Sequence, residues 1–303
     1  MRILVTGGLG FIGSHLVRYF LGEHAEVHIL DLHTGENGNV PASAVLHIQD
    51  ISDPDSVNLV RHIAPDYLFH LAAQSDVQKS IQNPSLDADS NIMGTIHMLE
   101  ACRQSHVRKI IFASTSGVYG QLEKKVISEV DPVSPVSFYA LSKRTSEQYM
   151  EMYRQLFGVS YTILRYGNVY GPGQQPKGEG GVVAVFLARL QRSELLSIHG
   201  DGLQTRDFIY VRDIVSANAA AMQKGDGQTF NISTGESTSI RMLADLFKEI
   251  VGAPIPLVYK PGNPGDVKHS CLDNRKALQL LNWRPAYNIR TGLEETIRNT
   301  WRT

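Results

Sequence analysis

The sequence predicts an α/β fold in which a doubly wound parallel sheet is joined to a smaller α/β domain. Short apolar strands alternate with helical patterns through the first half of the chain. This is the rhythm of a parallel sheet covered by helices on both faces. The first strand runs into closely spaced glycines that open a helix. Beyond Arg165 the alternation gives way to a glycine- and proline-rich stretch, residues 171–181, and to less regular elements.

The first strand and the turn after it are the most informative segment. The apolar run 3–5 leads into residues 6–13, TGGLGFIG, and then into a helical pattern. Glycines at such a junction let backbone N–H groups approach a pyrophosphate, and the positive end of the helix dipole holds it. Residues 26–31 form a second strand ending in Asp31, close to the roughly 20-residue spacing at which a carboxylate meets the adenosine ribose. The pattern predicts a Rossmann-type dinucleotide site. The carboxylate of Asp31 would repel a 2′-phosphate, so the pattern favours NAD over NADP.

The later elements follow the same rhythm. Helices are expected around residues 54–62, 90–105 and 139–156, and strands over residues 44–48, 67–71, 109–113 and 160–164. In an open parallel sheet, ligands bind beyond the carboxyl ends of the strands. The second domain is therefore expected to pack beside those ends, with the stretch 171–181 as a lip of the substrate site.

Composition argues against several classes of partner. The net charge is −1, apart from 11 histidines, and the chain has no Lys/Arg-rich run, so neither nucleic acid nor a membrane surface is expected to bind. The first strand begins directly after Met1, which leaves no room for a signal peptide, and the longest apolar run, 182–188, is too short to cross a membrane. Cys102 and Cys271 are expected to be buried and reduced, in a cytoplasmic protein. His24 and His28 lack a third ligand, so no metal site is expected.

Candidate catalytic groups lie on one helix and at one strand end. Tyr139 and Lys143 are four residues apart, which places them on one helical face. A nearby ammonium would stabilise the phenolate and lower the pKa of Tyr139. The phenol could then take a hydroxyl proton while hydride leaves the same carbon for a nicotinamide. Residues 114–120 follow a strand end, where a hydroxyl can hydrogen-bond the reacting oxygen. A Tyr and a Lys at this spacing can also be ordinary surface residues, but the dinucleotide pattern favours the catalytic interpretation.

With these segments in place, the chain resembles the extended short-chain dehydrogenase/reductase family and, within it, the UDP-glucose 4-epimerase group. The resemblance runs from Thr6 to Trp301 and includes the glycine loop, residues 50–51, residues 70–74, and Asn91 at the head of the helix that continues through 94–95. It implies catalytic roles for Thr115, Tyr139 and Lys143. It also implies that the cofactor, NAD, contacts Gly7, Gly10, Phe11, Ile12, Gly13, Asp31, Asp50, Ile51, Leu71, Ala72, Ala73, Asn91, Tyr139, Lys143 and Tyr166.

In the second half the resemblance rests on residues 164–172, 200–213, 231–235, 264–267 and 283–285. It implies an NAD-binding Rossmann domain over residues 1–166, with a return segment near 208–232, and a nucleotide-sugar-binding domain over residues 167–207 and 233–303. Arg206 would grip the diphosphate. Tyr210 and Trp283 are interpreted as core residues, and Asp213 as a helix N-cap. The implied substrate contacts are Thr115, Asn168, Val182, Val183, Arg206, Asp266 and Ser270.

Four departures from the family's patterns bear on the implied activity. Ser116 and Gly117 stand where nucleotide-sugar 4,6-dehydratases carry Asp-Glu, and uronate decarboxylases also carry Glu at the second of these positions. Asn168 stands where uronate 4-epimerases carry Thr. Asn263 replaces an arginine that grips the diphosphate in many members, and a lysine at 260 or 268 is the nearby alternative.

The resemblance implies reversible inversion at C4 of a UDP-hexose through a transient 4-keto sugar, with NAD held tightly. Ser270 is small enough to admit an N-acetyl group, which extends the expected range from UDP-glucose and UDP-galactose to UDP-GlcNAc and UDP-GalNAc. The alternatives are a reductase of a nucleotide-activated 4-keto sugar, a UDP-glucuronate 4-epimerase and, in a different class, a non-catalytic NAD-binding sensor. In the family, the helices near 90–105 and 139–156 form a four-helix bundle, so a homodimer is expected.

Overall fold

The main sheet determines where a ligand can bind. The computed structural model describes residues 1–300 apart from 35–39, 123, 177–180 and 263–267. Within these residues the main sheet has seven strands in the order β11-β6-β5-β4-β1-β2-β3, all parallel. The order reverses between β1 and β4, as in doubly wound Rossmann sheets, which confirms the predicted fold class. The strands are β1 (Arg2–Thr6), β2 (Glu26–Asp31), β3 (Ala44–Ile48), β4 (Tyr67–His70), β5 (Lys109–Thr115), β6 (Tyr161–Tyr166) and β11 (Gln228–Ile232).

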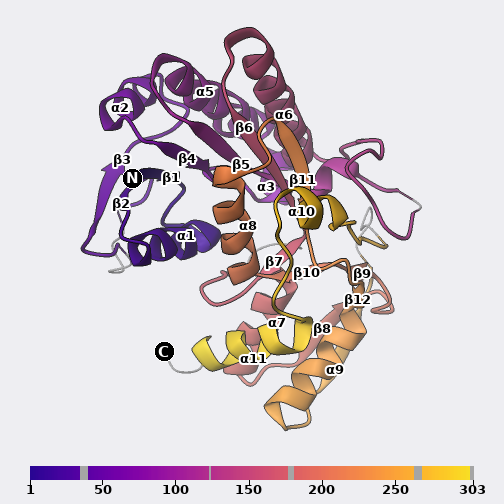
Figure 1. The fold of residues 1–303 in the computed structure, drawn as a ribbon. Helices are drawn as coiled ribbons and strands as arrows, with labels where there is room; N and C mark the ends of the chain where they lie inside the picture. Colours follow the sequence, from indigo (N-terminus) through magenta and orange to yellow (C-terminus); the bar gives the residue numbers. More distant parts are fainter. Residues whose placement is uncertain (35–39, 123, 177–180, 263–267, 301–303) are drawn as a thin grey trace.

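Helices cover both faces of this sheet because its central strands are apolar on both sides. β4 and β6 are buried at every position. One apolar cluster joins the sheet to α1 (Phe11–Gly22) and α8 (Val211–Gln223), and a second joins it to α2 (Asp55–Ile63), α5 (Gly94–Gln104) and α6 (Phe138–Phe157). Figure 1 shows the two helix layers on either side of the strands.

Local contacts decide where α6 begins, and the segment before α5 is irregular. Ser137 caps α6, since its hydroxyl accepts a hydrogen bond from the Ala140 N–H at 3.2 Å, so Tyr139 falls in the first turn. The helix expected over 90–105 is regular only from Gly94. Before it come α3 (Val77–Gln82), α4 (Pro84–Ala88) and one π-helical turn, Asp89–Met93. Asn91 therefore lies inside a π turn, a feature often found at functional sites, and not at a helix head.

A smaller layer of paired strands and helices lies beside the carboxyl ends of the main sheet (Figure 1). Its core is apolar and includes Tyr170, Phe186, Tyr210 and Phe247. After this layer has begun, the chain returns α8 and β11 to the main sheet, where β11 pairs with β6. Its elements are β7 (Asn168–Tyr170), α7 (Val182–Gln191), β8 (Leu196–His199), β9 (Thr205–Arg206), β10 (Phe208–Tyr210), β12 (Thr238–Ser239), α9 (Ile240–Val251), β13 (Leu257–Lys260) and α11 (Ile289–Thr300), and the short α10 (Arg275–Leu280) lies beside β11.

Several single-residue predictions concern packing. Tyr210 and Trp283 are buried, and so are the free thiols of Cys102 and Cys271, as expected. The N-cap assignment of Asp213 is wrong, because this residue lies in the first turn of α8, whose N-cap is Tyr210. Its carboxylate instead accepts hydrogen bonds from the backbone N–H groups of residues 286 and 287, at 2.8 and 3.2 Å, and so ties the C-terminal segment to α8.

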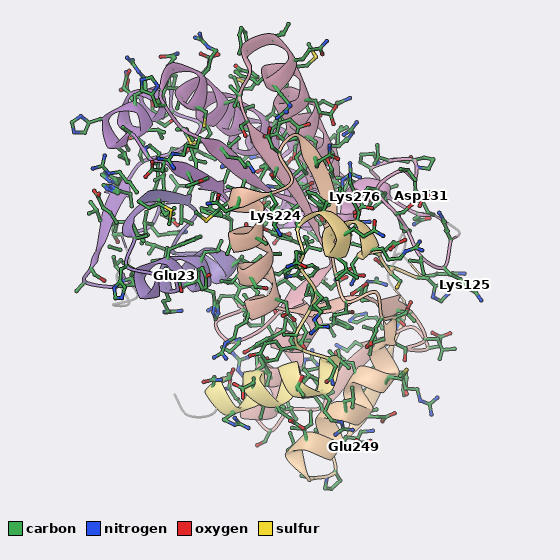
Figure 2. The ribbon with its side chains drawn as sticks, viewed as in Figure 1. Glu23, Lys125, Asp131, Lys224, Glu249 and Lys276 are labelled. Carbon is green, nitrogen blue, oxygen red and sulfur yellow. The ribbon has the colours of Figure 1, made fainter. Side chains whose placement is uncertain are left out.

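The edge of the main sheet at β11 is covered by a later helix. Lys276 lies on α10 beside this strand (Figure 2), and its ammonium donates to the carbonyl oxygen of Thr229 at 2.9 Å. A sheet edge protected in this way presents fewer free backbone groups for pairing with another chain. Among the described residues, each helix is too short or too polar to cross a bilayer.

Candidate active site

The candidate residues gather at one edge of the main sheet because each follows or ends a parallel strand. Gly7 follows β1, Asp31 ends β2, Asp50 follows β3 and Thr115 ends β5. The segment 71–73, which contains Leu71, Ala72 and Ala73, follows β4. All these strands run in the same direction, so their carboxyl ends meet at one edge, where ligands of this fold class bind.

The glycine loop after β1 has no room for side chains. Gly7 has a φ of 69°, and a Cβ atom there would lie 2.8 Å from the backbone nitrogen of Ala72. A Cβ atom on Gly13 would lie 2.1 Å from the carbonyl oxygen of Gly7, and one on Gly10 would lie 3.2 Å from the same oxygen. The loop and the first turn of α1 therefore pack backbone against backbone. Such packing leaves N–H groups free to approach a phosphate closely. Phe11 and Ile12, which begin α1, pack partly against the core of the smaller layer.

Asp31 holds this loop in place. Its carboxylate accepts hydrogen bonds from the Leu9 N–H at 3.0 Å and the His33 N–H at 3.1 Å, and the side chain is buried. A carboxylate has about four acceptor positions, so two remain for a ribose diol. The bare glycine cradle and this oriented carboxylate together fit the pyrophosphate and adenosine ribose of NAD.

The loops after β3 and β4 are fixed by contacts that exclude water. Asp50 accepts a hydrogen bond from the Ser52 N–H at 2.8 Å. Ile51 packs against Gly94, where a Cβ atom would lie 2.6 Å from the isoleucine side chain. Asn91 accepts a hydrogen bond from the Gln74 N–H at 2.8 Å and donates to the Gln74 carbonyl at 3.0 Å. The Asn91 amide thus holds the loop after β4 much as a neighbouring strand would.

A buried hydrogen-bonded chain joins β1, β4 and α5. The Thr6 hydroxyl oxygen accepts from the N–H groups of Leu71 and Ala72, at 3.2 and 3.1 Å, so its own proton is directed at His70 Nδ1, 2.8 Å away. His70 is then protonated on Nε2 and donates to the Thr95 hydroxyl at 3.0 Å. Burial, reinforced by the charge of Lys143, lowers the pKa of His70 to about 3. This imidazole therefore stays neutral and acts as a structural link.

The candidate catalytic residues lie at the end of β5 and the start of α6, where Thr115 and Tyr139 are hydrogen-bonded and Lys143 follows one helical turn later. The Thr115 hydroxyl accepts a hydrogen bond from the Gly117 N–H at 3.0 Å and also hydrogen-bonds the Tyr139 phenol. The Lys143 ammonium is buried, donates to the Ala113 carbonyl oxygen at 2.9 Å and lies 4.6 Å from the centre of the Phe112 ring. The end of β5 and the first two turns of α6 therefore supply a hydroxyl, a phenol and an ammonium at one place.

The expectation that Lys143 lowers the pKa of Tyr139 is wrong for the protein without ligands. Burial, reinforced by the negative charge of Asp87, raises the pKa of Tyr139 to about 12, although the Thr115 hydrogen bond opposes the rise. Burial also lowers the pKa of Lys143 to about 8, against the attraction of Asp87 and Glu147. Desolvation outweighs the pairwise attraction that the helical spacing suggested.

A buried ion pair behind the catalytic strand was not predicted. Glu147 and Arg165 form two hydrogen bonds of 2.6 and 2.8 Å, and both side chains are almost fully buried. Glu147 also accepts from the Ser114 hydroxyl at 2.6 Å, and Arg165 donates to the Tyr119 phenol at 2.9 Å. The sequence did indicate where Glu147 lies: it follows Lys143 by four residues, on the helical face that also carries Tyr139.

The residues expected to contact substrate lie on separate segments of the smaller layer. Asn168 begins β7, Arg206 ends β9, and Ser270 donates its N–H to the Thr205 carbonyl oxygen at 3.2 Å. Val182 and Val183 form the first turn of α7, with the side chain of Val183 packed in the core.

Three other positions singled out in the sequence are Tyr166, Asp266 and Asn263. The Tyr166 phenol, expected near the cofactor, hydrogen-bonds the side-chain amide of Asn218 on α8. Asp266 and Asn263 lie outside the described residues.

Comparison with known proteins shows the family to which this chain belongs. A sequence model described as the NAD dependent epimerase/dehydratase family matches residues 3–233. The chain belongs to this family. It is 40% identical over 305 residues to the UDP-glucose 4-epimerase of Mycolicibacterium smegmatis, with 98% of this chain and 97% of the relative covered.

Solved structures of relatives give the same result. The UDP-glucose 4-epimerase of Thermotoga maritima, solved with UDP-glucose, is 42% identical with a TM-score of 0.96, and the match covers 100% of this chain and 99% of that one. The UDP-glucose 4-epimerase of Thermus thermophilus, solved with NAD, is 38% identical with a TM-score of 0.93, and the match covers 99% of each chain.

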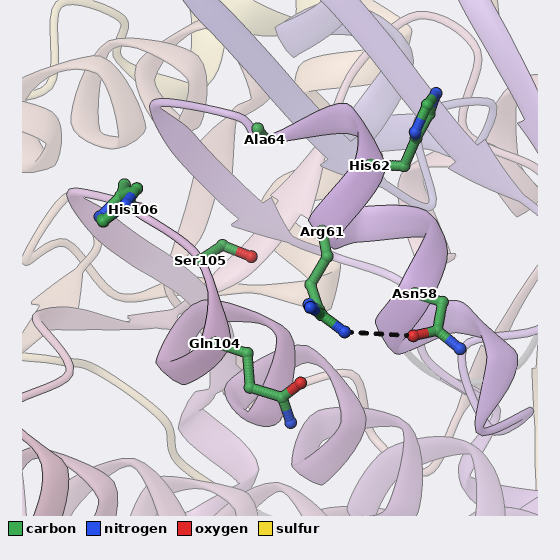
Figure 3. A pocket seen from close by; sticks show the side chains of 7 residues that line it. All are labelled: Asn58, Arg61, His62, Ala64, Gln104, Ser105 and His106. Atoms are coloured by element: carbon green, nitrogen blue, oxygen red, sulfur yellow. Dashed lines mark hydrogen bonds between the residues drawn. The ribbon is translucent and has the colours of Figure 1, made fainter.

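A surface pocket of about 390 Å³ lies elsewhere (Figure 3). It is formed by the last turns of α2 and α5 and the residues after them, including Arg61, His62 and His106. These helices lead into β4 and β5, so the pocket lies at the amino ends of the strands. Ligands of doubly wound sheets bind at the opposite edge, beyond the carboxyl ends. Basic side chains at helix C-termini are explained by the helix dipole, and we assign the pocket no role in the reaction.

Proposed function

We propose that this chain catalyses the reversible inversion of C4 in a UDP-hexose, with NAD held tightly and regenerated in each turnover. The observation that carries the proposal is the convergence of Thr115, Tyr139 and Lys143 at the sheet edge that also carries the glycine loop and Asp31. A phenol, a hydroxyl and a cation beside a dinucleotide cradle suit proton removal coupled to hydride transfer. The similarity to UDP-glucose 4-epimerases over nearly the whole chain supports it.

In this mechanism Tyr139 is the base that takes the proton of the sugar 4-hydroxyl. The hydroxyl of Thr115, which hydrogen-bonds the phenol, stabilises the phenolate and orients the reacting oxygen. Lys143 is anchored by the Ala113 carbonyl and supplies positive charge beside the phenol and the nicotinamide ribose. Bound NAD supplies the hydride acceptor and then the hydride donor at C4. Tyr139 returns the proton after the 4-keto sugar has turned about its diphosphate linkage.

The proposed cofactor contacts are those at the sheet edge. The N–H groups of Gly7 and Gly10 bond to backbone carbonyl oxygens, so these glycines would give the pyrophosphate room to approach. The N–H groups of Phe11, Ile12 and Gly13 in the first turn of α1 would hold it, and Asp31 would accept from the adenosine ribose. The residues after β3 and β4, together with Asn91 and Tyr166, would form the remaining walls. This assignment treats residues 1–166 with the return segment 208–232 as the NAD-binding domain.

Anchoring of the UDP moiety is assigned to the smaller layer. Arg206 would grip the diphosphate, since a guanidinium offers a fork of donors that matches phosphate oxygens. Val182 and Val183 form the first turn of α7, and the N–H groups of a helix's first turn suit the same anion. Asn168 and Asp266 would contact the nucleotide sugar. The proposed nucleotide-sugar-binding domain then comprises residues 167–207 and 233–303.

The substrate range is proposed to include N-acetylated sugars. Ser270 lies in the segment that pairs with Thr205, next to the Arg206 backbone. A serine here leaves space that a tyrosine would fill. UDP-GlcNAc and UDP-GalNAc should therefore be interconverted as well as UDP-glucose and UDP-galactose.

A homodimer is proposed from the surface of α6. Apolar side chains recur along one exposed stripe of this helix at helical spacing, including Leu141, Tyr149 and Met152. Exposed Met93, just before α5, adds to the same kind of surface. Helices with such a stripe bury it by pairing with another helix.

A cytoplasmic location is proposed from the cysteines. The thiols of Cys102 and Cys271 are free and buried, which suits a reducing compartment.

The deciding experiment combines product analysis with identification of the bound nucleotide. Purified protein should convert UDP-galactose into UDP-glucose without added cofactor, and denaturation should release NAD or NADH, identified by mass spectrometry. Release of mainly NADP, or turnover that consumes added reduced cofactor, would instead indicate a reductase. Conversion restricted to UDP-uronates would indicate the uronate 4-epimerase, and bound NAD without any turnover would indicate the sensor.

A further inference from the structure

Asp207 is a fully buried carboxylate in the smaller layer, and its described partners donate hydrogen bonds to it. One oxygen accepts from the Thr234 N–H at 2.8 Å and from the Thr234 hydroxyl at 2.7 Å. The other accepts from the N–H groups of Gly235 at 3.1 Å and Leu272 at 3.2 Å. The Cys271 thiol also hydrogen-bonds this carboxylate. Because its partners are donors, both oxygens of the carboxylate act as acceptors.

This arrangement fixes three segments that are distant in sequence. Burial raises the pKa of Asp207, and the hydrogen bonds from Thr234, Leu272 and Gly235 oppose that rise. A buried charge tolerates little loss of such hydrogen bonds. The loop after β11, the segment around Leu272 and the turn between β9 and β10 are therefore held in one relative position.

The segments fixed by Asp207 are those that carry the proposed substrate residues. Its backbone carbonyl accepts the N–H of Asn168 at 2.7 Å. This close approach requires Gly167, where a Cβ atom would lie 2.9 Å from that oxygen. Arg206 is the preceding residue, and Thr205 pairs with the segment that contains Ser270, through hydrogen bonds of 2.8 and 3.2 Å. Asp207 thus lies where three backbones meet: its carbonyl oxygen binds Asn168, Arg206 precedes it, and its carboxylate binds Leu272, two residues after Ser270.

We propose that Asp207 is the positioning residue of the nucleotide-sugar site: by binding Thr234, Gly235 and Leu272, its carboxylate fixes the backbone that presents Asn168, Arg206 and Ser270 to the UDP-sugar. The inference rests on the proposed function. Asp207 does not touch the reacting atoms in this proposal, so its loss weakens substrate binding and leaves the chemical step nearly intact. The glycine loop is held separately by Asp31, and the loop after β4 by Thr6, so NAD binding does not depend on Asp207.

The test is Asp207→Asn, which keeps the size of the side chain but turns one acceptor into a donor that faces other donors. The KM for UDP-galactose should rise at least ~10-fold while kcat falls less than ~3-fold, the signature of lost uniform binding. The bound NAD per protomer should equal that of the wild type. The matched control is Asp213→Asn, another buried carboxylate that accepts two backbone N–H groups. It should lower the melting temperature but leave KM within twofold.

A milder variant keeps the test decisive if Asp207→Asn does not fold. Thr234→Val removes one hydroxyl donor and leaves the backbone N–H, so KM should rise ~3-fold with kcat and NAD content unchanged. A KM within twofold of wild type in every folded variant would show a purely structural role and overturn the proposal. Loss of NAD together with the rise in KM would overturn it too. A wild-type protein that neither binds nor turns over UDP-sugars would instead refute the proposed function, and this inference with it.

Discussion

Replacing Glu147 with glutamine should cost the protein much of its stability. The carboxylate is fully buried and accepts two hydrogen bonds from Arg165, one from the Ser114 hydroxyl and one from Arg144. Burial alone would lower the pKa of Arg165, and Glu147 is the main group that raises it. The guanidinium nevertheless stays charged after the substitution, because arginine is not deprotonated in proteins. Removing one partner of a buried ion pair costs about 3–5 kcal/mol, because an uncompensated charge remains.

The expected loss can be read as a change in melting temperature. For a chain of this size 1 kcal/mol corresponds to about 2 °C, so Glu147→Gln should lower the midpoint by roughly 6–10 °C in differential scanning calorimetry. The matched control is Glu151→Gln on the same helix, whose 3.3 Å ion pair with Arg144 is partly exposed. An exposed pair contributes less than about 1 kcal/mol, so the control should shift the midpoint by less than about 2 °C. Equal shifts for the two variants would refute the reasoning that burial makes the Glu147 pair important.

Four further outcomes follow from the site and its surface. Tyr139→Phe should lower kcat for UDP-galactose by at least ~10², the range of general acid–base catalysis, with bound NAD unchanged. Lys143→Met should abolish turnover yet raise the melting temperature of NAD-free protein by a few degrees at pH 7. The pKa of Lys143 is lowered from 10.5 to about 8, so holding its ammonium destabilises the fold below pH 8, and the gain should fade between pH 8 and pH 10.5. Ser270→Tyr should abolish conversion of UDP-GalNAc and spare that of UDP-galactose. Leu141→Arg should turn the proposed dimer into a monomer in light scattering.

For each of these four predictions, one outcome would contradict the reasoning behind it. Wild-type turnover by Tyr139→Phe would exclude the phenol as the base. A pH-independent difference in melting temperature for Lys143→Met would mean that packing, and not charge, decides it. Equal losses on both sugar pairs with Ser270→Tyr would refute the size argument. A wild-type monomer at all concentrations would exclude the proposed dimer.

The features that could be predicted from the sequence are those encoded by local spacing. The glycine loop, Asp31 and the strand alternation depend on neighbours in the chain, and so does the pair formed by Tyr139 and Lys143. The pKa of Tyr139 could not be predicted in the same way, because it depends on how deeply the folded chain buries the phenol. Asp213 shows the same limit, since a local N-cap pattern was overridden by contacts with residues that pack against it from the C-terminal segment.

Contacts between distant segments were not predictable from local patterns. The partners of Asp207 lie 27, 28 and 65 residues further along the chain. Nothing in the residues around Asp207 indicates which backbone groups will reach it. Glu147 and Arg165 are separated by 18 residues and lie on different elements. Their pairing depends on the packing of α6 against β6.

The return of α8 and β11 to the main sheet has a consequence for synthesis of the protein. Until β11 emerges from the ribosome, β6 is an open edge strand that can pair with other chains. Lys109 on β5 also waits for α8, because its buried ammonium donates to the carbonyl oxygens of Ala221 and Lys224, at 3.0 Å each, at the end of that helix. The first half of the chain therefore cannot complete its own layer until α8 and β11 have been made, after the segment from β7 to β10 of the smaller layer.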